Sequence, residues 1–265
     1  MYEFNYRRAR SVEDAAEMLA NAEDPKVLSG GMTLLPTMKQ RLAQPSDLID
    51  ISHIEALSGI RHGDDRIIIG ALTRHAEVAA SDVVVKAIPA LAELANHIGD
   101  AQVRNRGTLG GSIANSDPAA DYPAALLALS AEITTNKRTI RADDFFIDIF
   151  ETALEEHELV TSVSFAVPQC AAYMKFPNPA SRYAIVGVMV AKFAGQVRVA
   201  VTGAGAKAFR YEEMEQALSE TFEPESLADI KLADDELNSD IHASAEYRAH
   251  LVGVMARRAV TAAKA

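Results

Sequence analysis

The feature of this sequence that most restricts its fold is a glycine pair flanked by small polar residues, which occurs twice. The first pair lies in residues 27–36, and the second lies in residues 104–112, about 80 residues further along the chain. Glycine has no side chain, so backbone N–H groups can approach a ligand closely, and consecutive N–H groups form an anion-binding nest. Each stretch alone could also be a plain glycine turn between two strands. Two together favour one extended ligand, such as a polyphosphate, held from two sides.

The residues around both pairs support this interpretation. Residues 34–42 are compatible with a helix, and Pro36 is tolerated if it lies in the first turn. A helix that begins behind two glycines is a suitable place for a phosphate group. After the second pair, residues 122–130 form an apolar, alanine-rich run that is too short to span a bilayer and predicts a buried helix.

Composition limits the classes of protein to which this chain can belong. Its 265 residues are 49% hydrophobic, enough for about two domains with a sizeable core. The formal net charge of −11 argues against a general nucleic-acid-binding protein. The single cysteine, Cys170, excludes an intramolecular disulfide, an iron–sulfur ligand set and a cysteine-based zinc site. With no apolar signal sequence and no run of 18 apolar residues, we expect a cytoplasmic protein without a membrane span.

Hydrophobic periodicity predicts mixed helices and strands, with a domain boundary at residue 168. Beyond Pro168 the pattern changes to antiparallel strands followed by helices. The expected helices cover residues 11–20, 34–42, 73–79, 88–95, 122–130 and much of the chain from 212 to 263. The expected strands cover residues 25–28, 47–51, 65–70, 132–135, 138–140, 159–167, 171–176, 184–193 and 196–201.

Several kinds of catalytic site have no matching motif in this chain. The seven histidines are scattered without metal-ligand spacing, so we expect each to be exposed or hydrogen-bonded within the core. Residues 203–207 lack the spacing of a phosphate-binding loop, and no nucleophile elbow occurs. No Gly-x-Gly-x-x-Gly occurs either, which counts against a Rossmann dinucleotide site.

The two glycine stretches, together with Asp117-Pro118-Ala119-Ala120-Asp121, closely resemble the FAD-binding medium subunits of molybdenum hydroxylases. That family includes the carbon monoxide dehydrogenase flavoprotein and the flavin region of xanthine dehydrogenase. The resemblance runs through most of the chain and includes residues 69–73, 145–146, 151–154, 183–187 and 242–248.

The resemblance implies an α+β fold with two domains. A two-lobed FAD-binding domain of the vanillyl-alcohol-oxidase or PCMH type would cover residues 1–168, with a small lobe over about 1–55 and a larger lobe over about 56–168. A C-terminal domain with a three-stranded antiparallel sheet and helices would cover residues 169–265. It further implies cofactor-binding roles for Leu28, Ser29, Gly30, Gly31, Met32, Thr33, Leu34, Thr108, Leu109, Gly110, Gly111, Ser112, Asp121, Lys175 and Tyr183.

Within that set the resemblance gives individual roles to three residues. Asp121 would reach the ribityl chain, Tyr183 would pack against the isoalloxazine, and Lys175 would place positive charge near the pyrimidine end of the flavin. Relatives of this wider fold that attach flavin covalently use a histidine where this chain has Met32, so we expect non-covalent FAD.

The implied function is electron transfer rather than chemistry on an organic substrate. Partner subunits would carry the molybdopterin and the [2Fe-2S] clusters, the complex would be a dimer of heterotrimers, and FAD here would pass electrons to an acceptor. One alternative is a self-sufficient FAD-dependent oxidoreductase of the same fold. Another is a non-catalytic nucleotide-binding or scaffold protein whose glycine loops are structural. The sequence names neither the substrate nor the acceptor, which is oxygen, a quinone, NAD or another molecule.

Overall fold

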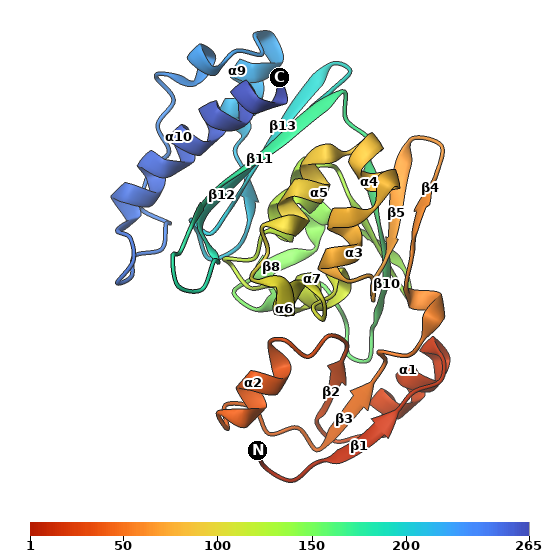
Figure 1. The fold of residues 1–265 in the computed structure, drawn as a ribbon. Coiled ribbons are helices and arrows are strands. Elements are labelled where there is room, and N and C mark those ends of the chain that lie inside the picture. The colour runs from red at the N-terminus through yellow and green to blue at the C-terminus, as the bar shows by residue number, and fades with distance from the viewer. Residues whose placement is uncertain (265) are drawn as a thin grey trace.

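The computed structural model describes residues 1–264 and shows three packed parts (Figure 1). The first is a small lobe with a three-stranded parallel sheet in the order β1-β3-β2. Ser11 caps the first helix by accepting from the Asp14 N–H at 3.1 Å, as its sequence predicts. The elements of this lobe are β1 (Asn5–Arg8), α1 (Val12–Ala20), β2 (Pro25–Leu28), α2 (Leu34–Lys39) and β3 (Asp47–Asp50).

The helix expected over residues 34–42 is shorter in the structure. It ends at Lys39, and Arg41 adopts a φ of 62°, which a continuing helix does not allow. The small lobe has its own apolar core, in which Ala15, Leu19 and Ile49 are buried.

The larger lobe is an antiparallel five-stranded sheet with helices packed against it. Its strand order is β4-β5-β10-β6-β7, so β10, which comes last of these five strands in the sequence, lies in the middle of the sheet. The strands are β4 (Ile60–His62), β5 (Arg66–Gly70), β6 (Glu132–Thr135), β7 (Thr139–Arg141) and β10 (Val160–Ala166), with a separate pair formed by β8 (Phe146–Asp148) and β9 (Glu151–Thr152). The helices are α3 (His75–Ala80), α4 (Asp82–Ala87), α5 (Pro89–Asn96), α6 (Ala101–Arg104), α7 (Leu109–Asn115) and α8 (Tyr122–Ala128).

The C-terminal part is an antiparallel sheet covered by helices. Three long strands are present as expected, and the two-residue β14 adds a fourth at the edge, in the order β11-β12-β13-β14. The strands are β11 (Cys170–Pro177), β12 (Ala184–Phe193), β13 (Gln196–Thr202) and β14 (Phe209–Arg210), and the helices are α9 (Glu212–Glu220) and α10 (Ala245–Ala263).

This sheet contributes to two separate cores. Met189 and Ala200 belong to the core of the larger lobe, whereas Val188 and Val199 belong to the core that α10 covers. Alternating side chains along β12 and β13 explain this, because neighbours on a strand point to opposite faces. We propose that the domain boundary lies at residue 168, where the chain leaves the five-stranded sheet.

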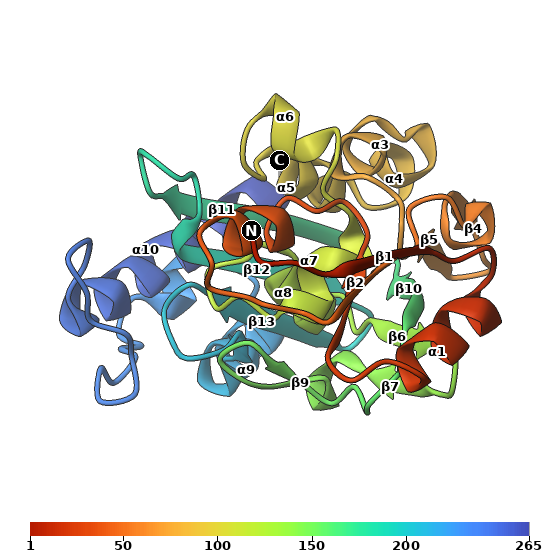
Figure 2. The same cartoon turned by 90° about the horizontal axis from the view of Figure 1, so that it is seen from below.

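Figure 2 views the molecule from below, with the small lobe in front and α1 and α10 on opposite sides. Over residues 1–264, none of the helices combines the length and the apolar composition required to cross a membrane.

Candidate functional site

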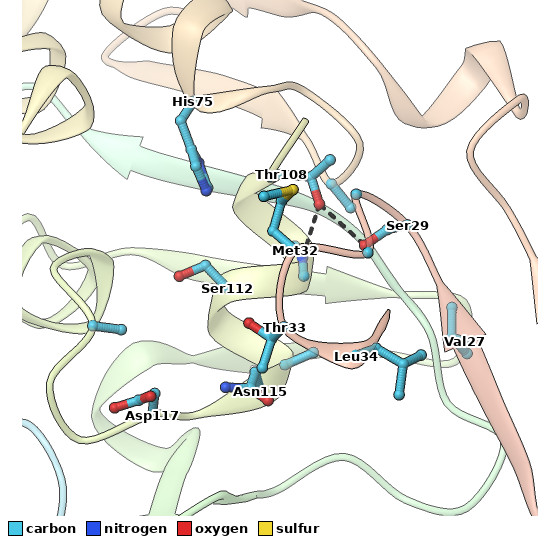
Figure 3. A pocket seen from close by; sticks show the side chains of 18 of the residues that line it. Val27, Ser29, Met32, Thr33, Leu34, His75, Thr108, Ser112, Asn115 and Asp117 are labelled. Atoms are coloured by element: carbon cyan, nitrogen blue, oxygen red, sulfur yellow. Dashed lines mark hydrogen bonds between the residues drawn. The ribbon is translucent and has the colours of Figure 1, made fainter. Parts of the chain in front are cut away.

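A cavity of about 680 Å³ runs between the two lobes and reaches the turn that joins β11 to β12. Its volume is within the range of about 300–1,000 Å³ that is usual for small-molecule sites. Both glycine stretches line it, although they are far apart in the sequence. Figure 3 draws side chains from both stretches at this cavity, with Met32 and Thr33 from the first and Thr108 and Ser112 from the second.

The first glycine stretch offers backbone donors to this cavity. Within the described chain, the N–H groups of Gly30, Gly31, Met32 and Thr33 donate no hydrogen bond. Gly31 has a φ of 71°, a left-handed conformation that turns the chain sharply before α2. Unpaired N–H groups in a turn of this kind form the anion-binding nest that the sequence predicts.

The second glycine stretch is different, because its N–H groups are already used. Gly110 and Gly111 lie in the first turn of α7. The Gly110 N–H donates to the Ala71 carbonyl at 2.8 Å, and the Gly111 N–H donates to Thr108 Oγ1 at 3.2 Å. The expected nest of backbone donors is therefore wrong for this stretch. It presents the hydroxyl groups of Thr108 and Ser112 to the cavity instead.

The two stretches also touch each other directly. The Thr108 hydroxyl donates to Ser29 Oγ at 3.2 Å, drawn as a dashed line in Figure 3. A Cβ added at Gly30 would overlap the Arg106 carbonyl, and one added at Gly111 would lie 2.7 Å from Ser29 Oγ. Both glycines therefore allow the close approach that brings the two lobes together around the cavity.

His75, at the start of α3, was not expected in the site. Its ring points into the cavity in Figure 3, while only 4% of the residue is exposed and Nδ1 has no partner among the described residues. Burial, together with the Arg104 guanidinium, lowers the pKa of His75 to about 4, so the ring is neutral near pH 7. The expectation that each histidine is exposed or hydrogen-bonded is wrong for this one.

The residues that line the cavity include a buried carboxylate, Asp121. Asp121 accepts from the Tyr173 hydroxyl at 2.5 Å and from Lys175 Nζ at 2.9 Å. Burial raises the pKa of Asp121, and the Lys175 ammonium opposes that shift.

Apolar and aromatic residues line the cavity together with the polar ones. They are Ile98, Phe150, Leu154, Val160 and Tyr183. Tyr183 remains 42% exposed, and partial burial, with the Asp117 carboxylate, raises the pKa of its hydroxyl. Hydrogen-bond donors and apolar surfaces in one cavity suit a dinucleotide, which has a pyrophosphate and flat rings, so the residues present fit FAD.

Comparison with known families agrees with this geometry. Residues 2–169 match the family described as the FAD binding domain in molybdopterin dehydrogenase. Residues 171–263 match the C-terminal domain of the CO dehydrogenase flavoprotein. The chain belongs to the FAD-binding medium subunits of molybdenum hydroxylases.

Individual relatives match over nearly their whole length. The chain is 37% identical to the nicotine 6-hydroxylase medium subunit of Paenarthrobacter nicotinovorans, over 98% of this chain and 97% of the relative. It is 36% identical to the carbon monoxide dehydrogenase medium chain of Hydrogenophaga pseudoflava, over 98% and 96%. Among solved structures, reconstituted CO dehydrogenase from Oligotropha carboxidovorans superposes with a TM-score of 0.90 at 32% identity, covering 99% of this chain and 98% of that one. This medium subunit is thus an oxidoreductase component, and its relatives are parts of multi-subunit enzymes.

The structure brings most of the predicted site residues together. All of them line the cavity except Leu109 and Lys175. Leu109 is fully buried in the core of the larger lobe, and Lys175 lies behind Asp121 with 4% of its side chain exposed. Lys175 therefore does not line the cavity itself. Its role of placing positive charge near the pyrimidine end of the flavin stays a prediction.

Several lining residues were missed. They include His75, Asn115, Asp117, Phe150 and Arg182. Asn115 and Asp117 follow the second glycine pair closely, so their proximity in sequence was a usable signal. His75, Phe150 and Arg182 reach the site only through tertiary packing, and no local pattern distinguishes them.

Proposed function

We propose that this subunit binds FAD in the cavity between its lobes and passes electrons from an iron–sulfur partner to an external acceptor. The observation that carries the proposal is the row of N–H groups from Gly30 to Thr33, which have no partner among residues 1–264 and line the same cavity as Thr108 and Ser112. This set can hold the two negative charges of a pyrophosphate without a metal ion between them.

When bound, FAD supplies the redox chemistry, since it accepts and releases electrons one or two at a time. The residues of this chain bind and orient it. The first glycine stretch donates hydrogen bonds to phosphate oxygens, Asp121 accepts from the hydroxyl groups of the ribityl chain, and Tyr183 packs against the ring system. His75 is neutral and points into the same space, so it adds a polar contact without adding a charge.

The finer assignments follow the family resemblance. We propose that a large subunit with the molybdenum cofactor oxidises the substrate and that a small subunit with [2Fe-2S] clusters relays electrons to this one. We also propose a dimer of such heterotrimers in the cytoplasm. The support is the near full-length similarity to medium subunits of multi-subunit enzymes.

We propose further that the flavin is not covalently attached, because Met32 offers no nucleophile at the relevant position. Acid precipitation of the purified protein should release all the flavin into the supernatant. Yellow colour that stays in the pellet would contradict this.

The test of the function separates a subunit from a self-sufficient enzyme. The chain alone, loaded with FAD, is mixed without oxygen with aromatic heterocycles, aldehydes and carbon monoxide, and the flavin absorbance is followed. We expect no bleaching until the molybdenum and iron–sulfur subunits are added. Bleaching by any substrate with the lone chain would show a self-sufficient flavoenzyme instead.

A further inference from the structure

Two residues of strand β11 hold the carboxylate of Asp121 through hydrogen bonds. Tyr173 and Lys175 are two positions apart on β11, so they point to the same face of the sheet. The Tyr173 hydroxyl donates to Oδ1 at 2.5 Å, and Lys175 Nζ donates to Oδ2 at 2.9 Å and to the His97 carbonyl at 3.2 Å. Asp121 lines the cavity, whereas Tyr173 and Lys175 do not.

The neighbouring strand is shaped to admit the Tyr173 hydroxyl. Gly187 on β12 pairs with Lys175, and a Cβ added at Gly187 would overlap the Tyr173 hydroxyl. Tyr173 is only 2% exposed, so this hydroxyl must have a partner inside the protein. Asp121 is that partner, and the glycine keeps the space open.

We propose that Tyr173 is a positioning residue which, with Lys175, fixes Asp121 as an ionised hydrogen-bond acceptor for the bound flavin cofactor. This rests on the proposed function. A carboxylate has about four lone-pair sites, and Tyr173 and Lys175 use one on each oxygen, which leaves the others for donors in the cavity. With both oxygens held, the carboxylate cannot rotate away from the ligand.

The groups that face Asp121 make its ionisation depend on Tyr173. Lys175 and Tyr173 approach from β11, His97 from the end of α5, Tyr183 from the β11–β12 turn, and Tyr122 is its neighbour in sequence. Of these five side chains, that of Lys175 is the one ammonium group. Without the Tyr173 hydroxyl, Oδ1 is buried with one partner fewer, so the pKa of Asp121 rises further and the protonated acid offers a weaker acceptor.

The experiment measures FAD affinity of the full chain by flavin fluorescence from pH 5.5 to 8.5. Tyr173→Phe should weaken binding about tenfold at pH 7. The loss should grow as the pH falls, whereas the wild-type affinity changes less. Tyr122→Phe is the matched control, since Tyr122 is also fully buried, its hydroxyl has no partner in the described chain, and it does not line the cavity. This control should change the affinity less than twofold.

A double-mutant comparison tests whether Tyr173 acts through Asp121. Tyr173→Phe combined with Asp121→Asn should bind FAD no more weakly than Asp121→Asn alone. Additive losses, or a loss in Tyr173→Phe that does not vary with pH, would overturn the proposal. If Tyr173→Phe does not fold, as judged by thermal unfolding of the FAD-free chain, Lys175→Gln takes its place and the same non-additivity is required. A wild-type chain that binds no FAD would instead refute the proposed function.

Discussion

The two glycine stretches look alike in the sequence, yet they contribute opposite things to the same cavity. The first, around Gly30 and Gly31, has backbone N–H groups without partners among the described residues and a left-handed φ at Gly31. The second, around Gly110 and Gly111, lies in a helix whose N–H groups bind Ala71 and Thr108. We propose that the first stretch binds a ligand through its backbone, whereas the second packs against its neighbours.

This difference shows that a glycine pair has at least two uses that sequence alone does not separate. Glycine permits a conformation with positive φ, and it also permits another chain to come close. Gly31 serves the first use. Gly110 serves the second, because a Cβ there would lie 2.6 Å from the Ala71 Cβ. Substitutions at the two sites should therefore affect different measurements.

The largest effect should come from Gly31→Val and should appear in FAD affinity. A strained φ costs about 1–3 kcal/mol, and misaligned N–H groups lose charge-assisted hydrogen bonds to phosphate. We expect the dissociation constant for FAD to rise about 100-fold or more. The melting temperature without FAD should fall only as far as this backbone strain predicts, because the side chains near a new Cβ are the flexible tips of Leu28 and Leu35 and add little overpacking. Flavin fluorescence and thermal unfolding measure the two quantities.

Gly195→Val is the matched control for backbone strain. Gly195 has a φ of 83° in the turn between β12 and β13, and a new Cβ there would meet nothing within 4 Å. It should carry similar strain without loss of FAD affinity. If Gly31→Val retains near-native affinity, the first stretch does not bind the pyrophosphate.

Gly110→Val should show the opposite profile, with stability lost first. Overpacking against Ala71 should lower the free energy of unfolding of the FAD-free chain by about 3 kcal/mol. That corresponds to a fall of about 6–12 °C in melting temperature for a chain of this size. Gly253→Ala in α10, where the nearest contact to a Cβ is 3.5 Å, should be neutral or slightly stabilising. A Gly110→Val chain that melts like the wild type would remove the distinction between the stretches.

The next largest effect is a dependence of stability on pH, to which His75 contributes. Its pKa is about 4 in the folded state against an ordinary value of 6.5, so the unfolded chain takes up this proton first as the pH falls. The stability that the neutral His75 ring contributes is fully present above pH 6.5 and is lost progressively as the pH falls to 4. Between pH 6.5 and pH 5 the wild type should lose about 2 kcal/mol through this group.

The measurement is denaturant unfolding of the FAD-free chain at several pH values. His75→Gln should lack this part of the pH dependence, although the substitution itself will lower stability at pH 7. The exposed His62 provides the control, since His62→Gln should leave the slope unchanged. Equal slopes for wild type and His75→Gln would show that folding does not lower the pKa of His75.

The parts of the fold and of the site that could be predicted from the sequence are those with a local sequence signal. The strand, glycine turn and helix around Gly31 follow from an apolar run and turn chemistry, and the structure contains them. Helix α7 was missed because two glycines argue against a helix. It forms because Thr108 caps it and Ile113 is buried beneath it.

Tertiary contacts were beyond the sequence for a physical reason. The pairing of Lys175 with Asp121 joins residues that are 54 positions apart, and no sequence pattern around either residue indicates it. A lysine on a strand is usually exposed, so the burial of this one behind a carboxylate could not be predicted from the sequence. The same applies to His75, whose burial depends on the close approach of Gly107.

The smallest effect should come from the one side-chain hydrogen bond that joins the two stretches. The Thr108 hydroxyl accepts from the Gly111 N–H and donates to Ser29 Oγ, so it caps α7 and links the lobes at once. Thr108→Val keeps the shape and removes the hydroxyl, which should cost about 1 kcal/mol of stability through the lost cap. It should also weaken FAD binding about fivefold, since Ser29 loses the partner that holds its hydroxyl at the cavity. Ser29→Ala removes the link but not the cap, so it should lower FAD affinity with no measurable change in melting temperature. Thr108→Val with full stability would show that the hydroxyl does not cap α7, and Ser29→Ala as unstable as Thr108→Val would show that the inter-lobe bond, rather than the cap, stabilises this region.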